Sequence, residues 1–439
     1  MKQIPTVSQL RFYANAGRIL RNPLPFHHQI FTELGDTFRL TIGLGQKVVF
    51  SRDAGFAEYV LQKNYKNYTK SPIQTVDLAK YLGHGLLTAE GELWKKQRKL
   101  IQPAFHKKQL KSLLDSIREA ILGELKMIKP GKKMDIFPVF NDLAFQTVVK
   151  SLFSSAVGQK EIDRLQYITE AAQKMLVKEL RQPYLNWWFK MNGSIKRSVD
   201  LTHEARGILN TLIEERETSG VRENDLLDML LDARYEDGTA MAREQLIDEI
   251  LILFTAGHET TSNALTFTCE LLARNSGVQD KIASEVEKAR SESENLFEFI
   301  QQCSYTQQVI EESMRLYPPA YFIDRVNVED DEFEGMFIPK GSNLLFSLYE
   351  IHRHEKYWEQ PETFDPDRFS EGRRSNYFPF GAGPRKCIGN NFAMYEMVMT
   401  IAELISKYEL STSKKEIEML PLITLKPKNA ILKFTPRSS

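Results

Sequence analysis

The sequence predicts a mainly α-helical protein with small β-sheets. Apolar residues recur at helical spacing from about residue 110 to residue 231 and again over 242–275, the longest such pattern in the chain. Shorter segments that flank turn residues, at 36–51, 333–348 and 423–434, are interpreted as β-hairpins. No repeat, low-complexity segment or linker separates these elements, and we therefore expect the whole chain to form a single domain.

The composition is that of a globular protein with a large core. Hydrophobic residues make up 42% of the 439 residues, and 58 basic side chains balance 58 acidic ones. A chain without net charge gives no electrostatic reason to bind nucleic acid. The three cysteines, Cys269, Cys303 and Cys387, are too few and too scattered for a disulfide framework, which indicates a reducing compartment.

The N-terminus lacks a recognisable targeting segment. Residues 1–10 contain no apolar core of the kind that a signal peptide needs. Apolar runs elsewhere are short, for example 250–254, whereas a helix that crosses a bilayer needs about 18 or more apolar residues. We therefore expect a soluble cytoplasmic protein without a membrane anchor.

The first hairpin and the helix after it are predicted from local patterning. Apolar residues alternate on both sides of a glycine-rich turn at 43–45, and an amphipathic helix follows over 53–64. The alternating residues are Phe38, Leu40, Ile42, Val48 and Phe50.

A tryptophan and an arginine stand one helical turn apart in the segment 91–100. This segment follows the turn Gly83-His84-Gly85, and its spacing places Trp94 and Arg98 on one face. Taken alone, the two could equally form a surface pair, and a histidine in a turn is more often solvated than functional. Six lysines in this region are interpreted as a solvated face: Lys95, Lys96, Lys99, Lys107, Lys108 and Lys111.

The longest helical pattern carries a glycine and two threonines at its centre, in Ala256-Gly257-His258-Glu259-Thr260-Thr261. A glycine inside a helix costs about 1 kcal/mol relative to alanine, so it requires a reason. The hydroxyl of Thr260 can bond to a carbonyl one turn earlier and open a local bulge. Ala256 and Ala264 leave room beside that hydroxyl. His258 lies about 200° around the helix from Thr260, and we assign it no catalytic role.

Two further patterns have a structural interpretation when taken alone. Glu312 and Arg315 stand three residues apart on a helix predicted over 306–316, and on a surface such a pair contributes little to stability. His352 and His354 have a spacing that could mark a metal site. No third ligand is evident, so structural histidines are the favoured interpretation.

The stretch 380–389 places one cysteine among glycines, a proline and cations. Two glycines and a proline force a tight turn before Cys387, and Gly389 lets the backbone change direction before a helix predicted over 390–408. The backbone N–H groups at the start of that helix, together with Arg385, favour a thiolate. Without further context, the alternative is a small buried apolar side chain.

This stretch resembles the heme-binding loop of the cytochromes P-450, whose pattern is F-x-x-G-x-R-x-C-x-G. The resemblance implies that Cys387 is the axial ligand of the iron in heme b (iron protoporphyrin IX), that Phe380 packs beside the sulfur, and that Arg385 pairs with a heme propionate. The residues that match the pattern are Phe380, Gly383, Arg385, Cys387 and Gly389.

Two more motifs of the family stand earlier in the chain. Trp94 and Arg98 match the W-x-x-x-R of its third helix, which implies that both reach a heme propionate. Residues 256–261 match its oxygen-activating motif, A-G-x-(D/E)-T-T. This match implies that Glu259 and Thr260 form an acid–alcohol pair that delivers protons during oxygen activation.

The fourth motif is structural. Glu312 and Arg315 match the family's E-x-x-R, a buried pair that is joined by an arginine further along the chain, for which Arg368 is the candidate. The three are implied to hold the scaffold behind the thiolate loop. Arg325 stands at the usual distance for one more propionate-binding arginine.

Together, the motifs imply the cytochrome P-450 fold and a heme-thiolate monooxygenase of a soluble, bacterial type. Such an enzyme uses O2 to insert one oxygen atom into a C–H bond of a small organic substrate, and attack beside an ether oxygen ends in O-demethylation. Because the chain ends soon after the last hairpin, we expect electrons from a separate ferredoxin or flavodoxin with its NAD(P)H reductase. The six lysines are then a possible docking surface for that acidic donor.

Two alternatives remain. A peroxygenase driven by H2O2 does not need the acid–alcohol pair of Glu259 and Thr260, and a non-catalytic heme sensor gives no reason for it. The substrate is open among fatty acids, terpenoids and methylated sugars. The resemblance places the segment 182–189 in the roof of the substrate cavity. We expect its aromatics to pack that roof rather than to stack on a substrate: Tyr184, Trp187, Trp188 and Phe189.

Overall fold

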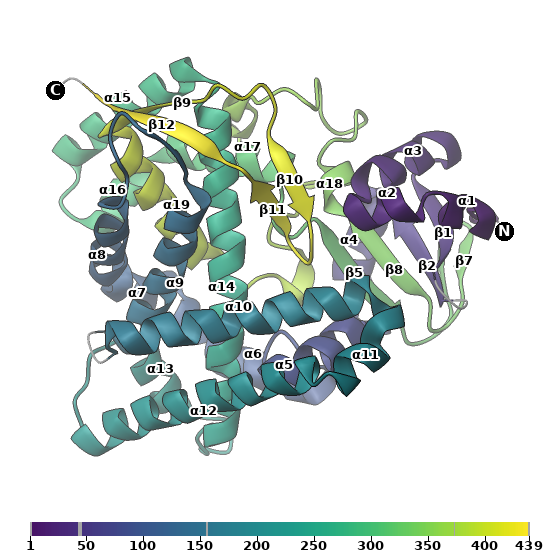
Figure 1. Ribbon diagram of the computed structural model, residues 1–439, viewed down its shortest axis with the longest axis horizontal. Coiled ribbons are helices and arrows are strands. Elements are labelled where there is room, and N and C mark those ends of the chain that lie inside the picture. The colour runs from purple at the N-terminus through teal and green to yellow at the C-terminus, as the bar shows by residue number, and fades with distance from the viewer. Residues whose placement is uncertain (1, 43–45, 155–156, 373, 438–439) are drawn as a thin grey trace. The chain divides into compact units, whose positions relative to one another are not determined.

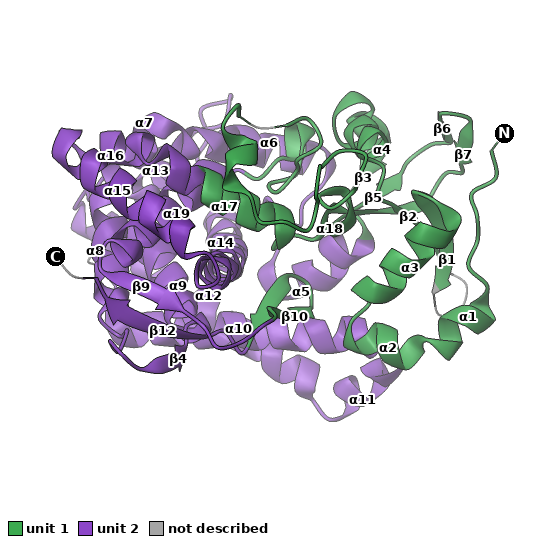
Figure 2. Cartoon of the chain, turned by 90° about the horizontal axis from the view of Figure 1, so that it is seen from above, with its two compact units in different colours: residues 1–71, 308–387, 416–428 green, residues 72–307, 388–415, 429–439 purple. Residues whose placement is uncertain are grey.

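A computed structural model describes residues 2–437 apart from 43–45, 155–156 and 373 (Figure 1). The described chain divides into two compact units (Figure 2). Most of the strands belong to unit 1 and most of the long helices to unit 2, in agreement with the predicted fold class. Unit 1 contains residues 1–71, 308–387 and 416–428, and unit 2 contains 72–307, 388–415 and 429–439.

Unit 1 is organised around a five-stranded sheet with the strand order β1-β2-β8-β5-β3. β2 runs parallel to β8, and the other neighbouring strands are antiparallel. Phe38 lies opposite Phe50, and their stacked rings, 5.3 Å apart, join Phe31 in the core. The strands are β1 (Thr37–Ile42), β2 (Gln46–Ser51), β3 (Tyr68–Thr69), β5 (Phe322–Asn327) and β8 (Asn343–Ser347).

Two small sheets and short helices complete unit 1. The sheets pair β6 (Asp331–Phe333) with β7 (Met336–Ile338) and β10 (Glu418–Pro421) with β11 (Leu425–Lys428). The helices are α1 (Gln9–Ala14), α2 (Ala16–Arg21), α3 (Leu24–Leu34), α4 (Ala54–Glu58) and α18 (Leu348–Ile351). A π-helical turn over Tyr59–Lys63 extends α4, so the helix predicted at 53–64 is present with a wider last turn.

One of the three predicted hairpins is confirmed and two are wrong. The hairpin at 36–51 is present as β1 and β2, and its turn lies outside the described residues. At 333–348, β7 pairs instead with β6 across Glu334-Gly335, where both φ angles are positive, whereas β8 pairs with β2 and β5. At 423–434, β11 pairs with β10. A turn residue shows where the chain bends, but it does not show which strand the next segment joins.

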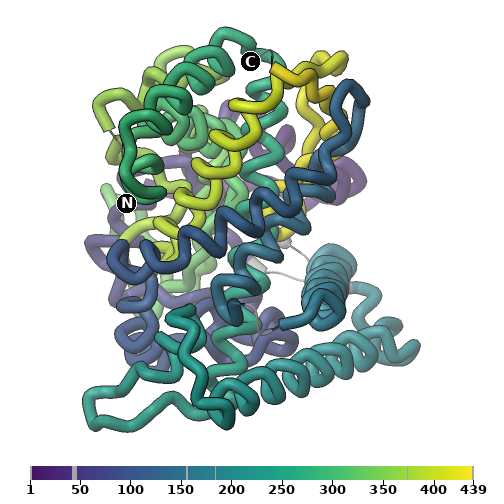
Figure 3. Tube along the Cα trace, turned by 90° about the vertical axis from the view of Figure 1, so that its left-hand side faces the viewer, coloured from purple at the N-terminus to yellow at the C-terminus, as the bar shows by residue number. Residues whose placement is uncertain are grey.

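Unit 2 is helical, and α14 (Arg243–Leu272) is its longest helix. Most side chains of α14 are buried. α9 (Phe137–Phe153) and other helices pack around it (Figure 3). At Gly257 the two helices come so close that an added Cβ would lie 3.1 Å from the Val148 side chain. Close packing of α9 against α14 therefore supplies the reason for this glycine.

The other helices of unit 2 follow the predicted pattern, with breaks at Pro130, Gly158 and 220–224. No helix in the described part of the chain combines the length and apolar character that crossing a lipid bilayer requires. The helices are α5 (Ala79–Leu82), α6 (Gly91–Ile101), α7 (Lys107–Leu110), α8 (Leu114–Leu125), α10 (Gln159–Arg181), α11 (Asn186–Met191), α12 (Ser194–Ser219), α13 (Leu226–Asp232), α15 (Ser276–Glu292), α16 (Leu296–Gln302) and α19 (Asn390–Ile405).

Two elements remain. A three-stranded sheet of unit 2 has the order β4-β12-β9, with β4 (Lys133–Asp135), β9 (Tyr408–Ser411) and β12 (Ile431–Pro436). α17 (Ser304–Leu316) contributes its residues from Gln308 onward to unit 1.

Candidate active site

The loop that carries Cys387 is held in one conformation by its backbone. The Cys387 N–H donates a hydrogen bond to the Phe380 carbonyl oxygen at 2.9 Å, which closes the loop. Gly381 and Gly383 have φ angles of +70° and +68°, which favour glycine. A Cβ at Gly383 would lie 1.9 Å from the Leu61 carbonyl oxygen, so the loop packs directly on the backbone of the π-helical turn.

Cys387 is exposed, whereas the other two cysteines are buried. Burial raises the pKa of the Cys303 thiol to about 12 and raises that of Cys269 well above its usual value. These two thiols are therefore inert structural side chains. Cys387 is the cysteine whose position and exposure suit a metal ligand.

Gly389 does not act as the sequence predicts. Its φ is −86°, an angle that any residue adopts, so the prediction that its conformational freedom turns the chain is wrong. An added Cβ would meet no described atom within 4 Å. Nothing in the fold of the polypeptide itself therefore requires a glycine at this position.

Two arginines predicted to bind propionates lie near neighbouring strands of the unit 1 sheet. Arg385 donates a hydrogen bond from Nη1 to the carbonyl oxygen of Tyr68 in β3 at 2.7 Å. Tyr68 pairs with Asn327 in β5, and Arg325 stands two residues before Asn327 on the same strand. Arg325 is 8% exposed and donates from Nη1 to the Asp324 carbonyl oxygen at 2.7 Å. The sheet thus gathers both guanidinium groups in unit 1.

Glu312, Arg315 and Arg368 lie together in unit 1. Arg315 forms a two-point ion pair with Glu312, at 2.7 and 2.8 Å, and both side chains are fully buried. Nε of Arg368 lies 3.5 Å from the same carboxylate. Nη1 of Arg315 also donates to the carbonyl oxygens of His352 and Pro361, at 2.8 and 2.7 Å. The pair therefore joins α17 to the irregular segment that precedes the cysteine loop.

Both histidines of the H-x-H pattern have structural partners in unit 1. Nε2 of His352 accepts a hydrogen bond from the Phe378 N–H at 3.0 Å, two residues before the cysteine loop. Burial, helped by the charge of Arg315, lowers the pKa of His352 to about 3, so the ring is neutral and can accept. Nε2 of His354 lies 3.0 Å from Oδ1 of Asp36. The sequence pattern singled out these residues without showing these partners.

In unit 2, Thr260 hydrogen-bonds one turn back along α14. Its Oγ1 donates to the Ala256 carbonyl oxygen at 2.7 Å, as predicted. The helix remains α-helical throughout Arg243–Leu272, so the predicted bulge is absent. A threonine hydroxyl can make this bond without opening the helix. Ala256 and Thr260 are among the few side chains of this helix that are not buried.

The two residues before Thr260 differ in their surroundings. Glu259 precedes it and is partly exposed. His258 is 1% exposed, its Nε2 lies 3.1 Å from Oδ1 of Asn141, and the edge of its ring meets Phe145. His258 therefore belongs to the contact between α9 and α14.

Carboxylates of α14 hold the turn that leads into α6. Asp248 accepts from the His84 N–H at 2.7 Å, and Glu249 accepts from the Leu86 N–H at 2.8 Å. His84 itself is exposed. On α6, Trp94 is 7% exposed and Arg98 donates from Nε to Gln102 at 3.1 Å. Unit 2 thus fixes the helix of Trp94 and Arg98 to the helix of Thr260.

The residues present suit a heme. Unit 1 offers an exposed cysteine on a rigid loop and two arginines near neighbouring strands of its sheet. Unit 2 offers Trp94 and Arg98 on α6 and a break in the burial of α14 around Ala256 and Thr260.

The sequence matches the cytochrome P450 family over residues 5–434. The chain belongs to the cytochrome P450 family. Membership shows that it is a monooxygenase, an oxidoreductase whose cofactor is heme b.

Relatives of this P450 come from bacteria and from eukaryotes. It is 30% identical over 336 residues to cyclooctat-9-en-7-ol 5-monooxygenase of Streptomyces melanosporofaciens, with 75% of this chain and 73% of the relative covered. It is 28% identical to the probable cytochrome P450 4s3 of Drosophila melanogaster, with 99% and 91% covered. The crystal structure of the cytochrome P450DA heme domain matches its fold with a TM-score of 0.87 at 22% identity, and the match covers 100% of this chain and 98% of that one.

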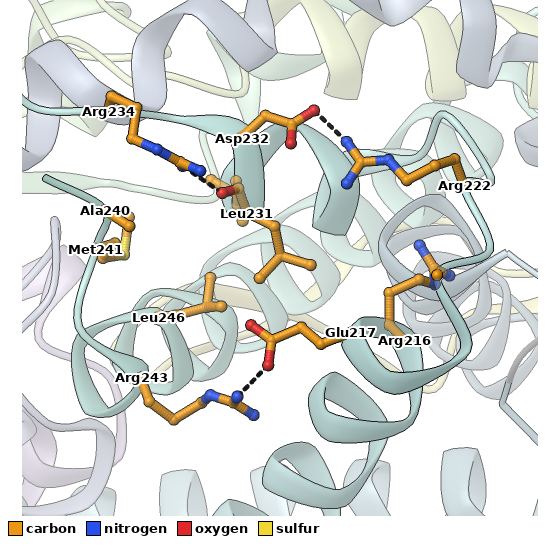
Figure 4. A pocket seen from close by; sticks show the side chains of 12 residues that line it. Arg216, Glu217, Arg222, Leu231, Asp232, Arg234, Ala240, Met241, Arg243 and Leu246 are labelled. Atoms are coloured by element: carbon orange, nitrogen blue, oxygen red, sulfur yellow. Dashed lines mark hydrogen bonds and ion pairs between the residues drawn. The ribbon is translucent and has the colours of Figure 1, made fainter. Parts of the chain in front are cut away.

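A pocket of about 340 Å³ in this P450 is unrelated to the heme residues (Figure 4). It lies at the start of α14, beside Arg243 and Leu246, and Thr260 is about 21 Å further along that helix. Most of its guanidinium groups are matched by carboxylates, since Arg243 pairs with Glu217 and Arg222 with Asp232. Arg234 donates instead to the carbonyl oxygens of Leu231 and Ala233. The pocket is an ion-paired junction of helices.

The lysines around α6 are partly engaged in local contacts. Lys95 pairs with Glu92 at 2.6 Å, Lys99 pairs with Glu236, and the ammonium of Lys111 lies 3.9 Å from the ring centre of Phe297. These contacts agree with the interpretation of a solvated face.

The aromatic segment differs from the prediction. Tyr184, Trp187 and Trp188 are 64%, 59% and 47% exposed, so the prediction that they pack the cavity roof is wrong. Phe189 alone of the four is buried. The reason is geometric, because Trp187, Trp188 and Phe189 are consecutive residues of the short helix α11, and consecutive helical residues point in different directions.

Proposed function

We propose that this P450 inserts one atom of O2 into a C–H bond of a small organic substrate and releases the other as water. Where the attacked carbon lies beside an ether oxygen, the product breaks down by O-demethylation. The observation that supports this proposal is the accessible Cys387 on a glycine-shaped loop that has the family's pattern. Heme b, when bound, supplies the oxygen activation, which a thiolate ligand favours.

Four residues of the cysteine loop are proposed to help hold the heme. Cys387 would hold the heme iron through its sulfur, and Phe380 would pack beside that sulfur. Gly383 allows the loop to lie against the backbone of Leu61, as its φ angle and the short distance require. The open space beside Gly389 is proposed to accommodate the heme edge.

Four groups of this chain are proposed to bind the carboxylates of the heme propionates. They are the indole N–H of Trp94 and the guanidinium groups of Arg98, Arg325 and Arg385. A guanidinium group suits a carboxylate because it can donate two parallel hydrogen bonds. Glu312, Arg315 and Arg368 are proposed to be structural, since they fasten α17 behind the loop.

Thr260 and Glu259 are proposed to move protons. The single proton of the Thr260 hydroxyl points to the Ala256 carbonyl oxygen, which leaves the lone pairs of Oγ1 on the side away from that carbonyl. A water molecule can donate to these lone pairs while the bond to Ala256 is kept, and the hydroxyl can donate its own proton to another oxygen atom after it rotates. Glu259, which precedes Thr260 and is partly exposed, is the proposed source of the proton.

The partners and the setting are also proposed. We expect a ferredoxin or a flavodoxin with its NAD(P)H reductase to deliver two electrons for each turnover to a single heme domain in the bacterial cytoplasm. Turnover with NAD(P)H and O2 alone, without added donor proteins, would contradict this part of the proposal. A screen of fatty acids, terpenoids and methylated sugars for ligands that shift the Soret band of the heme would narrow the substrate class.

The proton-transfer role is tested at Thr260. Thr260→Ala removes the hydroxyl and should uncouple the reaction, so that product formed per NADPH falls by about tenfold or more while O2 consumption continues. Thr260→Ser keeps a hydroxyl at the same position and should retain most of the coupling. Unchanged coupling in Thr260→Ala, together with equal turnover on H2O2, would instead indicate a peroxygenase. A protein that consumes no O2 with any reductant would be a sensor.

A further inference from the structure

A second pocket in unit 2, of about 350 Å³, is lined mainly by carboxylates and carboxamides. Its lining comes from α8, α9 and α10 (Figure 1), with Glu124 on α8, Asp142 on α9, and Asp163 and Glu170 on α10. None of its described lining residues is a lysine or an arginine. The volume lies in the range of small-molecule sites, about 300–1,000 Å³, and the charge suits a cation.

Three of the four carboxylates lack a cationic partner in the described part of the chain. Asp142 accepts a hydrogen bond from Nε2 of Gln166 at 2.7 Å, and Asp163 accepts one from Nε2 of Gln159 at 2.7 Å. These donors are neutral amides, and Glu124 forms no ion pair with any described residue. The charge of these carboxylates is therefore not neutralised by ion pairs within the described fold.

The charges of the pocket act on one another. Burial and the charge of Asp142 raise the pKa of Glu124, and the charge of Lys150 offsets this effect only in part. Glu170 does have a cationic neighbour, because the ammonium of Lys174 lies 3.1 Å away. The Lys174 side chain is 72% exposed, however, and an exposed pair of this kind contributes little to stability. A bound cation would relieve the repulsion among these carboxylates.

A buried carboxamide at this pocket has an oxygen atom without a partner. Gln146 is 5% exposed and lines the pocket, and it stands four residues after Asp142 on the same face of α9. Its Oε1 accepts no hydrogen bond from any described group. A buried oxygen without a donor is costly and rare in a folded protein. A ligand N–H group in the pocket would supply the missing donor.

The spacing of the carboxylates selects the class of cation. Asp163 and Glu170 are seven residues apart on α10, which separates them by about 10 Å along its axis. A single ammonium group cannot reach both carboxylates, whereas a flexible chain with several ammonium groups can. We propose that this pocket binds an aliphatic polyamine, with its ammonium groups on the carboxylates and one of its N–H groups on Oε1 of Gln146.

A metal ion fits this pocket less well than a polyamine. A metal ion needs several ligands around one centre. In the residues that the structure describes, no group of three or more acidic, histidine or cysteine side chains converges in this way. Tyr167, which is 56% exposed at the same pocket, offers instead the face of an aromatic ring, and such a face attracts an ammonium group.

The proposal is tested by titration calorimetry of the heme-loaded protein with spermidine, a polyamine. We expect a dissociation constant below about 0.1 mM at physiological ionic strength. Butylamine, which has a single ammonium group, should bind at least about tenfold more weakly, because it can pair with one carboxylate only. Since the contacts are ionic, spermidine binding should also weaken as the concentration of sodium chloride is raised.

Two variants remove the proposed contacts. Asp142→Asn with Asp163→Asn keeps the size of both side chains and removes their charges, so it should weaken spermidine binding at least about tenfold. Gln146→Met replaces the carboxamide by an apolar side chain of similar size and should weaken binding about fivefold. It should not lower the temperature of thermal unfolding, since the lost oxygen has no partner in the described fold.

The matched control is Glu287→Gln with Glu292→Gln on α15. Both side chains are exposed, neither is among the described lining residues, and the change removes the same amount of charge from unit 2. Spermidine binding should change by less than about twofold. The Soret spectrum of each variant shows whether the heme domain is intact, so a failure of the heme proposal is seen separately.

Four results would overturn the proposal. The first is spermidine binding no tighter than that of butylamine, and the second is unchanged binding in Gln146→Met or equal loss of binding in the aspartate variant and the control. The third is displacement of spermidine by an equal concentration of CaCl2, which would indicate general attraction of cations to an acidic surface. The fourth is tighter binding of a trilysine peptide, which would assign the pocket to a basic segment of a partner protein.

Discussion

At Gly383 the backbone has a φ of +68°, and a Cβ there would lie 1.9 Å from the carbonyl oxygen of Leu61. Both facts forbid a side chain unless the cysteine loop moves. Gly389, six residues later, has an ordinary φ of −86° and open space around its Cα. The two glycines match the same sequence pattern, but the structure requires only Gly383 for the fold of the chain itself.

We therefore expect Gly383→Ala and Gly389→Ala to differ. Strain at positive φ and the collision with Leu61 should together cost Gly383→Ala about 3 kcal/mol of stability and displace Cys387, with loss of heme. The free energy of unfolding of Gly389→Ala should stay within about 0.5 kcal/mol of the wild type. Thermal unfolding and the heme content of the purified proteins measure the difference. Equal destabilisation by the two substitutions would contradict this account of the loop.

Motif residues of the site were predictable from the sequence because each motif is local. Their partners were not predictable, for the same reason. Gly383 packs on the carbonyl oxygen of Leu61, and Arg385 bonds to that of Tyr68, and both oxygens come from segments more than 300 residues away. Every residue has a carbonyl group, so no sequence pattern distinguishes these two.

At the scale of elements, a buried carboxyl group joins α19 to α9 within unit 2. Oγ1 of Thr147 lies 2.5 Å from Oε1 of Glu396 and 3.0 Å from the Ala144 carbonyl oxygen. A hydroxyl has one proton to donate, and a carbonyl oxygen can only accept. If the hydroxyl donates to Ala144, the carboxyl group must donate to the hydroxyl. Glu396 is fully buried, and burial raises its pKa to about 8, so it is protonated at neutral pH.

This pKa predicts how the stability of the protein depends on pH. The unfolded chain releases the Glu396 proton near pH 4.5, whereas the folded chain keeps it to about pH 8. The stabilising contribution of the neutral group is therefore complete below pH 4.5 and is lost as the pH rises through about 8. Glu396→Gln has no proton to release, and its amide can donate to Thr147. Relative to the wild type, it should gain about 2–4 kcal/mol between pH 5 and pH 8.

Urea unfolding at the two pH values measures this gain. Glu403→Gln on the same helix is the matched control, because Glu403 pairs with Arg118 at 3.2 Å and Arg290 at 3.0 Å. That variant should lose stability at both pH values, since it leaves two guanidinium groups without their carboxylate. A stability difference between Glu396→Gln and the wild type that does not change with pH would contradict a protonated Glu396.

Strand pairing shows the limit of prediction at this scale. A turn at Pro339-Lys340-Gly341, in the middle of the hairpin predicted at 333–348, is present, and Gly341 has a φ of +75°. The strand after it nevertheless joins β2 and β5, because pairing depends on which distant strand offers a free edge and a matching apolar face. The exposure of Tyr184, Trp187 and Trp188 was mispredicted for a similar reason, since an aromatic residue in a helical segment does not show whether another part of the protein covers it.

At the scale of the whole molecule, the predicted heme residues divide between the two units. Cys387, Arg325 and Arg385 belong to unit 1, and Trp94, Arg98 and Thr260 belong to unit 2. Family membership shows that the cofactor is heme b. The bond between Cys387 and iron is the central claim of our account.

The most direct test of that claim uses the three cysteines as each other's controls. The reduced protein under carbon monoxide should show the absorption maximum from which the P450 family takes its name. Cys387→Ser should abolish this maximum and the monooxygenase activity, whereas Cys269→Ser and Cys303→Ser, at buried positions, should keep the maximum. If Cys387→Ser keeps the maximum and remains active, or if the wild type never shows it, the account is contradicted.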